Sequence, residues 1–144
     1  MLAKTDWMHL IPHQGAMCLL DAVVTWDDST IHAISETHQH ANHPLRGEQG
    51  LHAVHLAEYG AQAMAVHGAL FDRERGHVAV RQGRLVSLRD VTLAVEFVEV
   101  MHSRLDVYAK KIHADASGAQ YGFRVEHEGR LLVDGRATVI HPAD

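Results

Sequence analysis

The segment from residue 51 to residue 71 is the feature of this sequence that most constrains the fold. It reads LHAVHLAEYGAQAMAVHGALF and, placed on a helix, it is apolar around nearly its whole circumference. A helix of that kind is usually enclosed by other elements. Small side chains, among them Ala57, Gly60, Ala61 and Ala65, would let a sheet approach its backbone closely. We therefore expect one long central helix with a sheet wrapped around it.

Apolar and polar residues alternate through the second half of the chain, which is the two-residue period of strands with one buried face. Tyr121, Phe123 and Val125, for example, are expected to face the core. The intervening segments are short enough to join antiparallel neighbours. We predict strands over 77–88, 92–101, 104–114, 119–128 and 130–140.

The first half adds two shorter predicted strands within 19–37, separated by the polar turn Asp-Asp-Ser-Thr. Strands around one enclosed helix predict an α+β arrangement, in which a curled antiparallel sheet of about five to seven strands wraps the helix. The chain has 144 residues and no evident linker, so we expect residues 1–144 to form a single domain.

Composition excludes several classes of function. The formal net charge is −5 and the arginines form no block, so nucleic-acid binding is not expected. Cys18 is the only cysteine, which rules out an internal disulfide and suits a reducing compartment. The N-terminus lacks the apolar run of a signal peptide, and no segment has the roughly 20 apolar residues of a membrane span. We expect a cytoplasmic protein.

A polar stripe interrupts the apolar helix. His55, Glu58 and Gln62 are spaced three and four residues apart, which places them on one face. Burying an isolated carboxylate is costly, so Glu58 should be paired, hydrogen-bonded, held neutral or directed into a cleft. The alternative is that Glu58 simply reaches solvent at the edge of the helix. Gln62, one turn on, is expected to orient it.

The loop before the helix is the second candidate source of chemistry. Residues 35–50, SETHQHANHPLRGEQG, are polar and rich in histidine, and loops of this kind often carry reactive groups. His38, His40 and His43 are candidate bases. A base on a loop opposite an acid on a helix is what elimination chemistry requires, because a neutral imidazole can take the α-proton of a 3-hydroxyacyl thioester while the acid protonates the departing hydroxyl.

Two motifs together resemble a known family. IPHQGAMCLLD (11–21), a histidine-containing loop and LHAVHLAEYGAQA (51–63) resemble the 3-hydroxyacyl-(acyl carrier protein) dehydratases of the hotdog fold, and most closely the dehydratase branch of aryl polyene clusters. The resemblance implies conversion of a 3-hydroxyacyl thioester to the trans-2-enoyl thioester, in fatty-acid-like or aryl polyene biosynthesis. It also implies that the acyl chain is carried on the phosphopantetheine of an acyl carrier protein, and that no cofactor or metal takes part.

The resemblance assigns site residues one by one. Glu58 matches the catalytic acid and Gln62 the glutamine one turn later. His43 is the nearest equivalent of the catalytic histidine, although it stands one residue farther from Glu58 than the family pattern places it. His38 is the second candidate for the base. His13, in the first motif, is the third.

The same resemblance suggests substrate contacts. His13, Gln62 and Ala53 are expected to contact the substrate; Ala53 stands where the family has a glycine at the helix start, and its N–H would polarise the thioester carbonyl. The apolar surroundings of Glu58 are expected to keep that acid protonated near neutral pH. A metal site is not expected, because His52, His55 and Glu58 advance in steps of three residues that drift by about 60° each around a helix.

Assembly and two rival functions complete the expectations. In the family, two sheets join in a dimer and the acid of one subunit meets the histidine of the other, so we expect a homodimer or a hetero-oligomer with another hotdog protein. The first rival is a hotdog acyl thioesterase, which directs its acid at water. The second is a non-catalytic subunit that stabilises another hotdog dehydratase.

Overall fold

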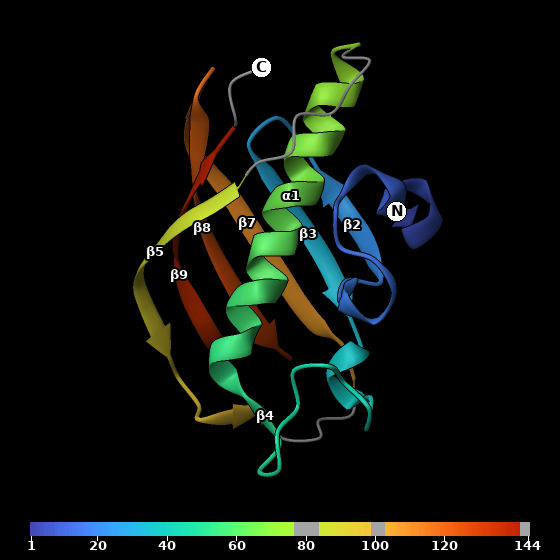
Figure 1. The fold of residues 1–144 in the computed structure, drawn as a ribbon, viewed down its shortest axis with the longest axis vertical. Helices are drawn as coiled ribbons and strands as arrows, with labels where there is room; N and C mark the ends of the chain where they lie inside the picture. The colour runs from blue at the N-terminus through green and yellow to red at the C-terminus, as the bar shows by residue number, and fades with distance from the viewer. Residues whose placement is uncertain (77–83, 99–102, 142–144) are drawn as a thin grey trace.

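The long helix lies across one face of a large antiparallel sheet in the computed structural model, which describes residues 1–76, 84–98 and 103–141 (Figure 1). Helix α1 is Leu56–Glu74. The sheet has seven strands in the order β1-β2-β3-β7-β8-β9-β5. Their bounds are β1 Leu2–Ala3, β2 Ala22–Trp26, β3 Thr30–Ser35, β5 Arg84–Leu93, β7 Leu105–Asp115, β8 Gly118–His127 and β9 Arg130–Ile140. One helix against seven strands confirms the expected α+β arrangement.

Short elements connect the helix and the sheet. A separate two-stranded sheet pairs β4, Leu51–His52, with β6, Phe97–Val98. Single turns of 3-10 helix make up much of the rest of the first half: η1 Lys4–Asp6, η2 Met8–Leu10, η3 Gly15–Met17, η4 Thr37–Gln39 and η5 Ala53–His55. The first three of these turns lie in the N-terminal segment, residues 1–21, which runs beside α1 (Figure 1).

The predicted strand over 92–101 is wrong as a single strand. Strand β5 ends at Leu93, and the chain then leaves the large sheet to form β6 with β4. Periodicity misses this change because the alternation of apolar and polar residues continues through both pieces, which differ in the sheet they join. Residues 77–83 of the predicted strand 77–88, and residues 99–101, lie outside the described part of the chain.

The helix begins later than predicted. Residues 51–55 belong to β4 and η5, and α1 starts at Leu56. The His52 side chain accepts the Val54 N–H at 3.1 Å, which closes the turn that precedes the helix. Although α1 has 19 residues, no helix in the described ranges is long and apolar enough to cross a membrane.

Close contact between helix and sheet confirms the role of the small residues. Tyr121, Phe123 and Val125 all face the core, as predicted. A Cβ added at Gly60 would lie 2.5 Å from the Phe123 ring, so at this point of α1 the sheet leaves no room for a side chain. The helix therefore packs directly on β8, and its polar stripe must find space on another flank.

Strand β5 forms the outer edge of the large sheet. No described strand pairs with its other side. Five of its large apolar side chains are exposed, and Val86 is the most open at 52%. Exposed apolar edge strands are templates for pairing with another chain.

Candidate active site

Glu58 meets a histidine inside its own chain. The carboxylate projects from the first turn of α1 and its Oε1 lies 3.1 Å from Nε2 of His13. Both side chains are partly open, with 32% of Glu58 and 24% of His13 exposed. Nδ1 of His13 is buried and has no hydrogen-bond partner among the described atoms. The third candidate base of the sequence analysis is thus the imidazole that contacts the acid.

Gln62 fastens the N-terminal segment to the helix. Its side chain is fully buried, its Oε1 accepts the Leu19 N–H at 2.8 Å, and its Nε2 donates to the Met17 carbonyl at 2.6 Å. The same Nε2 lies 3.4 Å from Oε1 of Glu58. Gln62 therefore holds the segment that carries His13 against α1 and also contacts the acid.

Glu58 is ionised in this arrangement. The hydrogen bond from His13 is the strongest influence and holds the pKa of Glu58 below its ordinary value; Gln62 acts in the same direction, while burial acts against them. The expectation that apolar surroundings keep this acid protonated near neutral pH is therefore wrong for the unliganded protein. The apolar wall is present, but the imidazole outweighs it.

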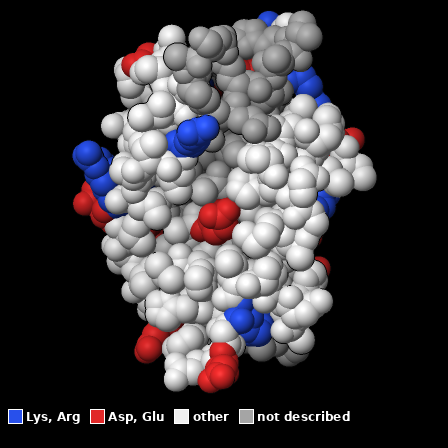
Figure 2. All heavy atoms as spheres, in the orientation of Figure 1, with Lys and Arg blue, Asp and Glu red and all other residues white. Residues whose placement is uncertain are grey.

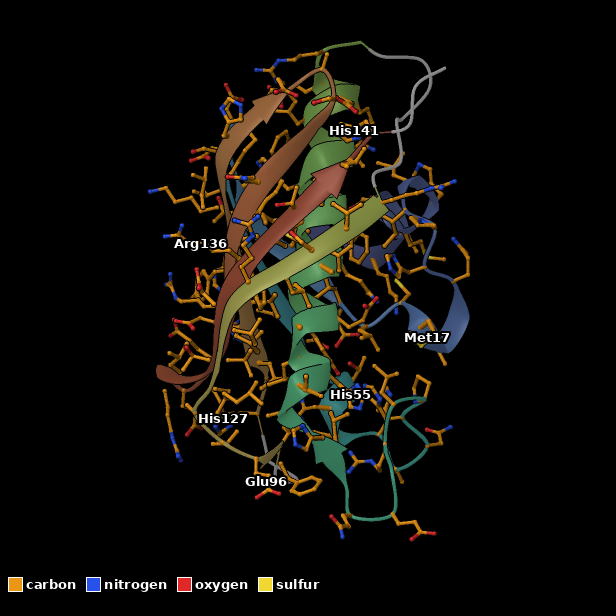
Figure 3. The ribbon with its side chains drawn as sticks, turned by 60° about the vertical axis from the view of Figure 1, so that its left-hand side comes forward. Met17, His55, Glu96, His127, Arg136 and His141 are labelled. Atoms are coloured by element: carbon orange, nitrogen blue, oxygen red, sulfur yellow. The ribbon has the colours of Figure 1, made fainter. Side chains whose placement is uncertain are left out.

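An apolar cavity of about 220 Å³ begins at this pair. Its walls come from the N-terminal segment, from α1 and from strands β5, β8 and β9, and apart from Glu58, His13 and His141 they are largely apolar. The face shown in Figure 2 is hollowed near its centre, where acidic atoms lie among uncharged ones. In Figure 3, His55 marks the N-terminal end of α1 and His141 lies beside its C-terminal half, so a cavity lined by both Glu58 and His141 extends along the helix.

His43 makes different contacts. Its Nδ1 accepts the Leu45 N–H at 3.0 Å, so Nε2 carries the proton and donates to the Tyr59 hydroxyl at 2.9 Å. The side chain is only 5% exposed, and burial together with the nearby Arg46 charge holds the pKa of His43 below its usual value. Both ring nitrogens are engaged, and Tyr59 points about 100° around the helix from Glu58.

A buried hydroxyl network continues from His43 and was not foreseen from the sequence. The Tyr59 hydroxyl lies 2.7 Å from Oγ1 of Thr37, and Thr37 donates to the Leu19 carbonyl at 2.9 Å. Burial raises the pKa of Tyr59 to about 12. The one available signal was a tyrosine inside an otherwise apolar helix, since a buried phenol needs a hydrogen-bond partner.

The other loop histidines make no described contact with the Glu58 carboxylate. His38 is buried, and its backbone carbonyl accepts a hydrogen bond from Arg46 at 2.6 Å. His40 is exposed. Within one chain, the described contacts of the Glu58 carboxylate are with His13 and Gln62.

Ala53 is the first residue of η5, the 3-10 turn that leads into α1, and its N–H is engaged. It donates to the Glu96 carbonyl at 2.8 Å, and Figure 3 shows Glu96 at the foot of α1. A thioester oxygen would have to compete with that carbonyl for the same donor. In the described residues no group of three histidine, cysteine or acidic side chains is placed to hold a metal ion.

Comparisons with known proteins agree with this architecture. The model of the ApeP-like family, described as ApeP dehydratase, matches residues 5–144. Among solved structures, the dehydratase heterocomplex ApeI:P from Xenorhabdus doucetiae superposes with a TM-score of 0.81 at 25% sequence identity, covering 94% of this chain and 90% of that chain. Curated protein sequences give no match.

More distant structures share the fold alone. A mutant of the phenylacetic acid degradation protein PaaI from Thermus thermophilus has a TM-score of 0.59 at 18% identity, covering 83% of this chain and 91% of that one. A mutant thioesterase from Staphylococcus aureus has a TM-score of 0.58 at 14% identity, covering 84% and 93%. Together with the dehydratase match, these similarities confirm the hotdog fold.

Proposed function

This chain belongs to the ApeP-like family of dehydratases, and we propose that it removes water from a 3-hydroxyacyl thioester carried on the phosphopantetheine arm of an acyl carrier protein. The observation that carries this proposal is the pair of Glu58 and His13, 3.1 Å apart at the start of an apolar cavity. The pair supplies an acid and a base, and the cavity supplies space for an acyl chain. The reaction needs no cofactor.

A single proton shared by the pair suffices for the elimination. With that proton on Glu58, His13 is a neutral imidazole that can remove the proton from C2 of the substrate. The electrons of the C2–H bond form the C2–C3 double bond, the C3–O bond breaks, and Glu58 protonates the departing hydroxyl to give water. The pair is left as imidazolium and carboxylate, and returning the proton from His13 to Glu58 restores the starting state.

Substrate binding itself favours the acidic form of Glu58. The hydrogen bond from His13 is what lowers the pKa of the free carboxyl, whereas burial raises it. A substrate that enters between the two side chains breaks that hydrogen bond and removes water. Burial is then the largest remaining influence, and it raises the pKa of Glu58 against the smaller lowering effect of Gln62. The proton then moves to Glu58 when the chemistry requires it.

His13 is a better candidate for the base than His43, the residue assigned by resemblance. Both nitrogens of the His43 ring are committed to Leu45 and Tyr59, so accepting a proton would break a buried hydrogen bond. The His13 ring has only the contact with Glu58, and its Nδ1 is not engaged. We assign His43 a positioning role in holding the loop against α1.

The exposed edge of β5 supports pairing with a second hotdog chain. ApeI:P from Xenorhabdus doucetiae is a dehydratase heterocomplex, and the chain described here has a long apolar edge strand suited to contact with a second chain. We propose that the working enzyme is a dimer joined at β5, either of two copies or with another hotdog protein. In the second case the partner's imidazole is an additional candidate base for Glu58.

The decisive experiment compares dehydration with hydrolysis. Purified chain, alone and co-expressed with candidate hotdog partners, is given 3-hydroxyacyl-(acyl carrier protein), and the enoyl product and free carrier protein are followed by mass spectrometry. Glu58→Gln and His13→Asn should each lower the dehydration rate by about two to four orders of magnitude. The matched controls are Glu48→Gln and His9→Asn, at two exposed positions, which should leave the rate unchanged.

Each alternative predicts a distinct outcome. A lower dehydration rate in His43→Asn, together with a normal rate in His13→Asn, would identify His43 on the loop as the base. Release of free acid and free carrier protein would identify a thioesterase. Full dehydration by an assembly containing both Glu58→Gln and His13→Asn would show that this chain is a non-catalytic subunit.

A further inference from the structure

Residues 18–21 of the N-terminal segment belong to no helix or strand, and side chains hold their backbone in place. Leu19 is held on both sides. Its N–H donates to Oε1 of Gln62 at 2.8 Å, on α1. Its carbonyl accepts the hydroxyl of Ser35 at 2.5 Å and that of Thr37 at 2.9 Å. The backbone of this one residue therefore joins the helix to the end of β3 and the turn that follows it.

The hydroxyl network that ends on the Leu19 carbonyl runs in one direction. Nδ1 of His43 accepts the Leu45 N–H, so Nε2 of His43 donates to the Tyr59 hydroxyl. The Tyr59 O–H in turn has Oγ1 of Thr37 as its acceptor, and the Thr37 O–H donates to Leu19. Hydrogen bonds arranged head to tail polarise and strengthen one another. The whole chain of donors therefore holds Leu19, and it begins on the histidine-rich loop.

Gln62 carries this constraint to the catalytic pair, Glu58 and His13. Its Nε2 lies 3.4 Å from Oε1 of Glu58, the atom that also lies 3.1 Å from Nε2 of His13. If Leu19 turned, its N–H would leave Gln62, and the amide would be free to turn away from Glu58. The same movement would release the segment in which His13 stands six residues before Leu19.

The hydroxyl network itself is shut off from the substrate. Thr37 is 6% exposed and Tyr59 is fully buried. Neither is among the described residues that line the cavity beside Glu58. Any influence of these two residues on the reaction must therefore pass through the protein.

We propose that Thr37 and Tyr59 are positioning residues, which act through the backbone of Leu19 to hold the catalytic pair in its reactive geometry. This inference rests on the proposed function for the role of that pair. It adds two residues that do not meet the substrate. It also gives His43 a task in the reaction other than that of the base, because its Nε2–H is the donor to Tyr59.

The ionisation of Glu58 tests the proposal without depending on turnover. The Glu58 side-chain carboxyl carbon is titrated by nuclear magnetic resonance in the unliganded full chain, or in its assembly with the partner if one is required. In Thr37→Val, which keeps the shape but lacks the hydroxyl, the pKa of Glu58 should rise, because the contacts with His13 and Gln62 that lower it are loosened. Thr37→Ser restores the hydroxyl and should restore the pKa.

Dehydration kinetics provide the second measurement. A misplacement of about 1 Å can cost about a hundredfold in rate, so Thr37→Val should lower kcat by about tenfold to a hundredfold. KM should change little, because the cavity walls are intact. Tyr59→Phe should act in the same direction but less strongly, since Thr37 still reaches Leu19.

Two matched controls remove the same groups elsewhere. Thr25 is exposed on β2, and Tyr108 lies on β7 and is not among the described residues of the cavity walls. Thr25→Val and Tyr108→Phe should leave both kcat and the pKa of Glu58 unchanged.

A double-mutant cycle tests the route through Gln62. If Gln62 transmits the constraint, Thr37→Val should change the pKa of Glu58 and kcat little further in a Gln62→Leu background. Effects of Thr37→Val that are as large with leucine at position 62 as with glutamine would overturn this route.

The outcomes separate the positioning role from the proposed function. A folded Thr37→Val chain with an unchanged Glu58 pKa and kcat would overturn the proposal, and so would a Thr37→Ser chain as slow as Thr37→Val. If Thr37→Val does not fold, an unchanged Glu58 pKa and kcat in Tyr59→Phe would overturn it instead. A raised Glu58 pKa in Thr37→Val, in a protein that catalyses no dehydration, would retain the positioning of the pair and reject the proposed function.

Discussion

Replacing Gln62 by leucine should loosen the N-terminal segment and thereby the active site. The side chain makes two short hydrogen bonds, a buried one to the Leu19 N–H at 2.8 Å and a partly buried one to the Met17 carbonyl at 2.6 Å. Leucine has a similar size but neither a donor nor an acceptor. Each backbone group left buried without a partner costs about 1–3 kcal/mol. The free energy of unfolding should therefore fall by about 2–5 kcal/mol, a large part of the about 5–15 kcal/mol typical of a domain.

Tryptophan fluorescence can localise this loss. The chain has two tryptophans, and Trp7 is fully buried in the N-terminal segment. In a Trp26→Phe background, Trp7 reports on that segment while far-ultraviolet circular dichroism reports on the whole fold. With Gln62→Leu, the urea transition seen by Trp7 should precede the one seen by circular dichroism. The pKa of Glu58 should also rise, because Gln62 is one of the groups that lower it.

Gln39→Leu is the control for this experiment. The Gln39 side chain makes one exposed contact of 3.4 Å, so its replacement should change the unfolding free energy by less than about 0.5 kcal/mol. A loss below about 1 kcal/mol for Gln62→Leu, with coincident transitions, would refute the argument that this glutamine anchors the segment.

Three further predictions concern the fold and its assembly. Burial holds the pKa of His67 below its ordinary value of 6.5, so at mildly acidic pH the unfolded chain binds more protons than the folded one. The stability due to neutral His67 is therefore complete above pH 6.5 and is lost as pH falls through the folded-state pKa. Urea titrations between pH 8 and 5 will measure this loss. Gly60→Ala forces a methyl into the Phe123 ring and should destabilise the protein by about 1–3 kcal/mol, whereas Gly68→Ala should be neutral or stabilising by up to about 1 kcal/mol, both measured by urea unfolding. Val86→Lys should weaken association at the β5 edge, measured by light scattering.

Controls for these predictions come from the same chain. Ile112 is as exposed as Val86 but lies on β7, inside the sheet, so Ile112→Lys should leave association intact. Equal effects of the two lysines would argue against β5 as the interface. If the unfolding free energy of His67→Gln still falls with pH as steeply as that of the unchanged protein, His67 does not explain the pH dependence of stability.

Patterns local in sequence predicted most of the fold. The apolar segment around Glu58 gave the enclosed helix because a 3.6-residue period depends only on nearby residues. Alternation through 119–128 identified which face of β8 is buried for the same reason. The passage from β5 to β6 escaped this reasoning, because a strand that changes sheets keeps its alternation, and the start of α1 was displaced by the His52 cap.

The candidate site was predictable only in part. The helical spacing of Glu58 and Gln62 placed both on one flank, which the 3.4 Å contact bears out. The contact of Glu58 with His13 joins residues far apart in sequence and depends on the path of the N-terminal segment. Likewise, counting residues could not show that Leu45 and Tyr59 occupy both nitrogens of His43, since that depends on how the loop folds onto the helix.

Leu85 belongs to two surfaces at once. It lines the apolar cavity beside Glu58 and is also 43% exposed on the outer strand β5, where a partner is proposed to dock. If docking and acyl binding both move this side chain, the two equilibria are thermodynamically linked, and each must change the other by the same factor. The partner chosen by the chain would then help to decide which acyl groups it accepts, and a bound acyl group would in turn strengthen or weaken the choice of partner.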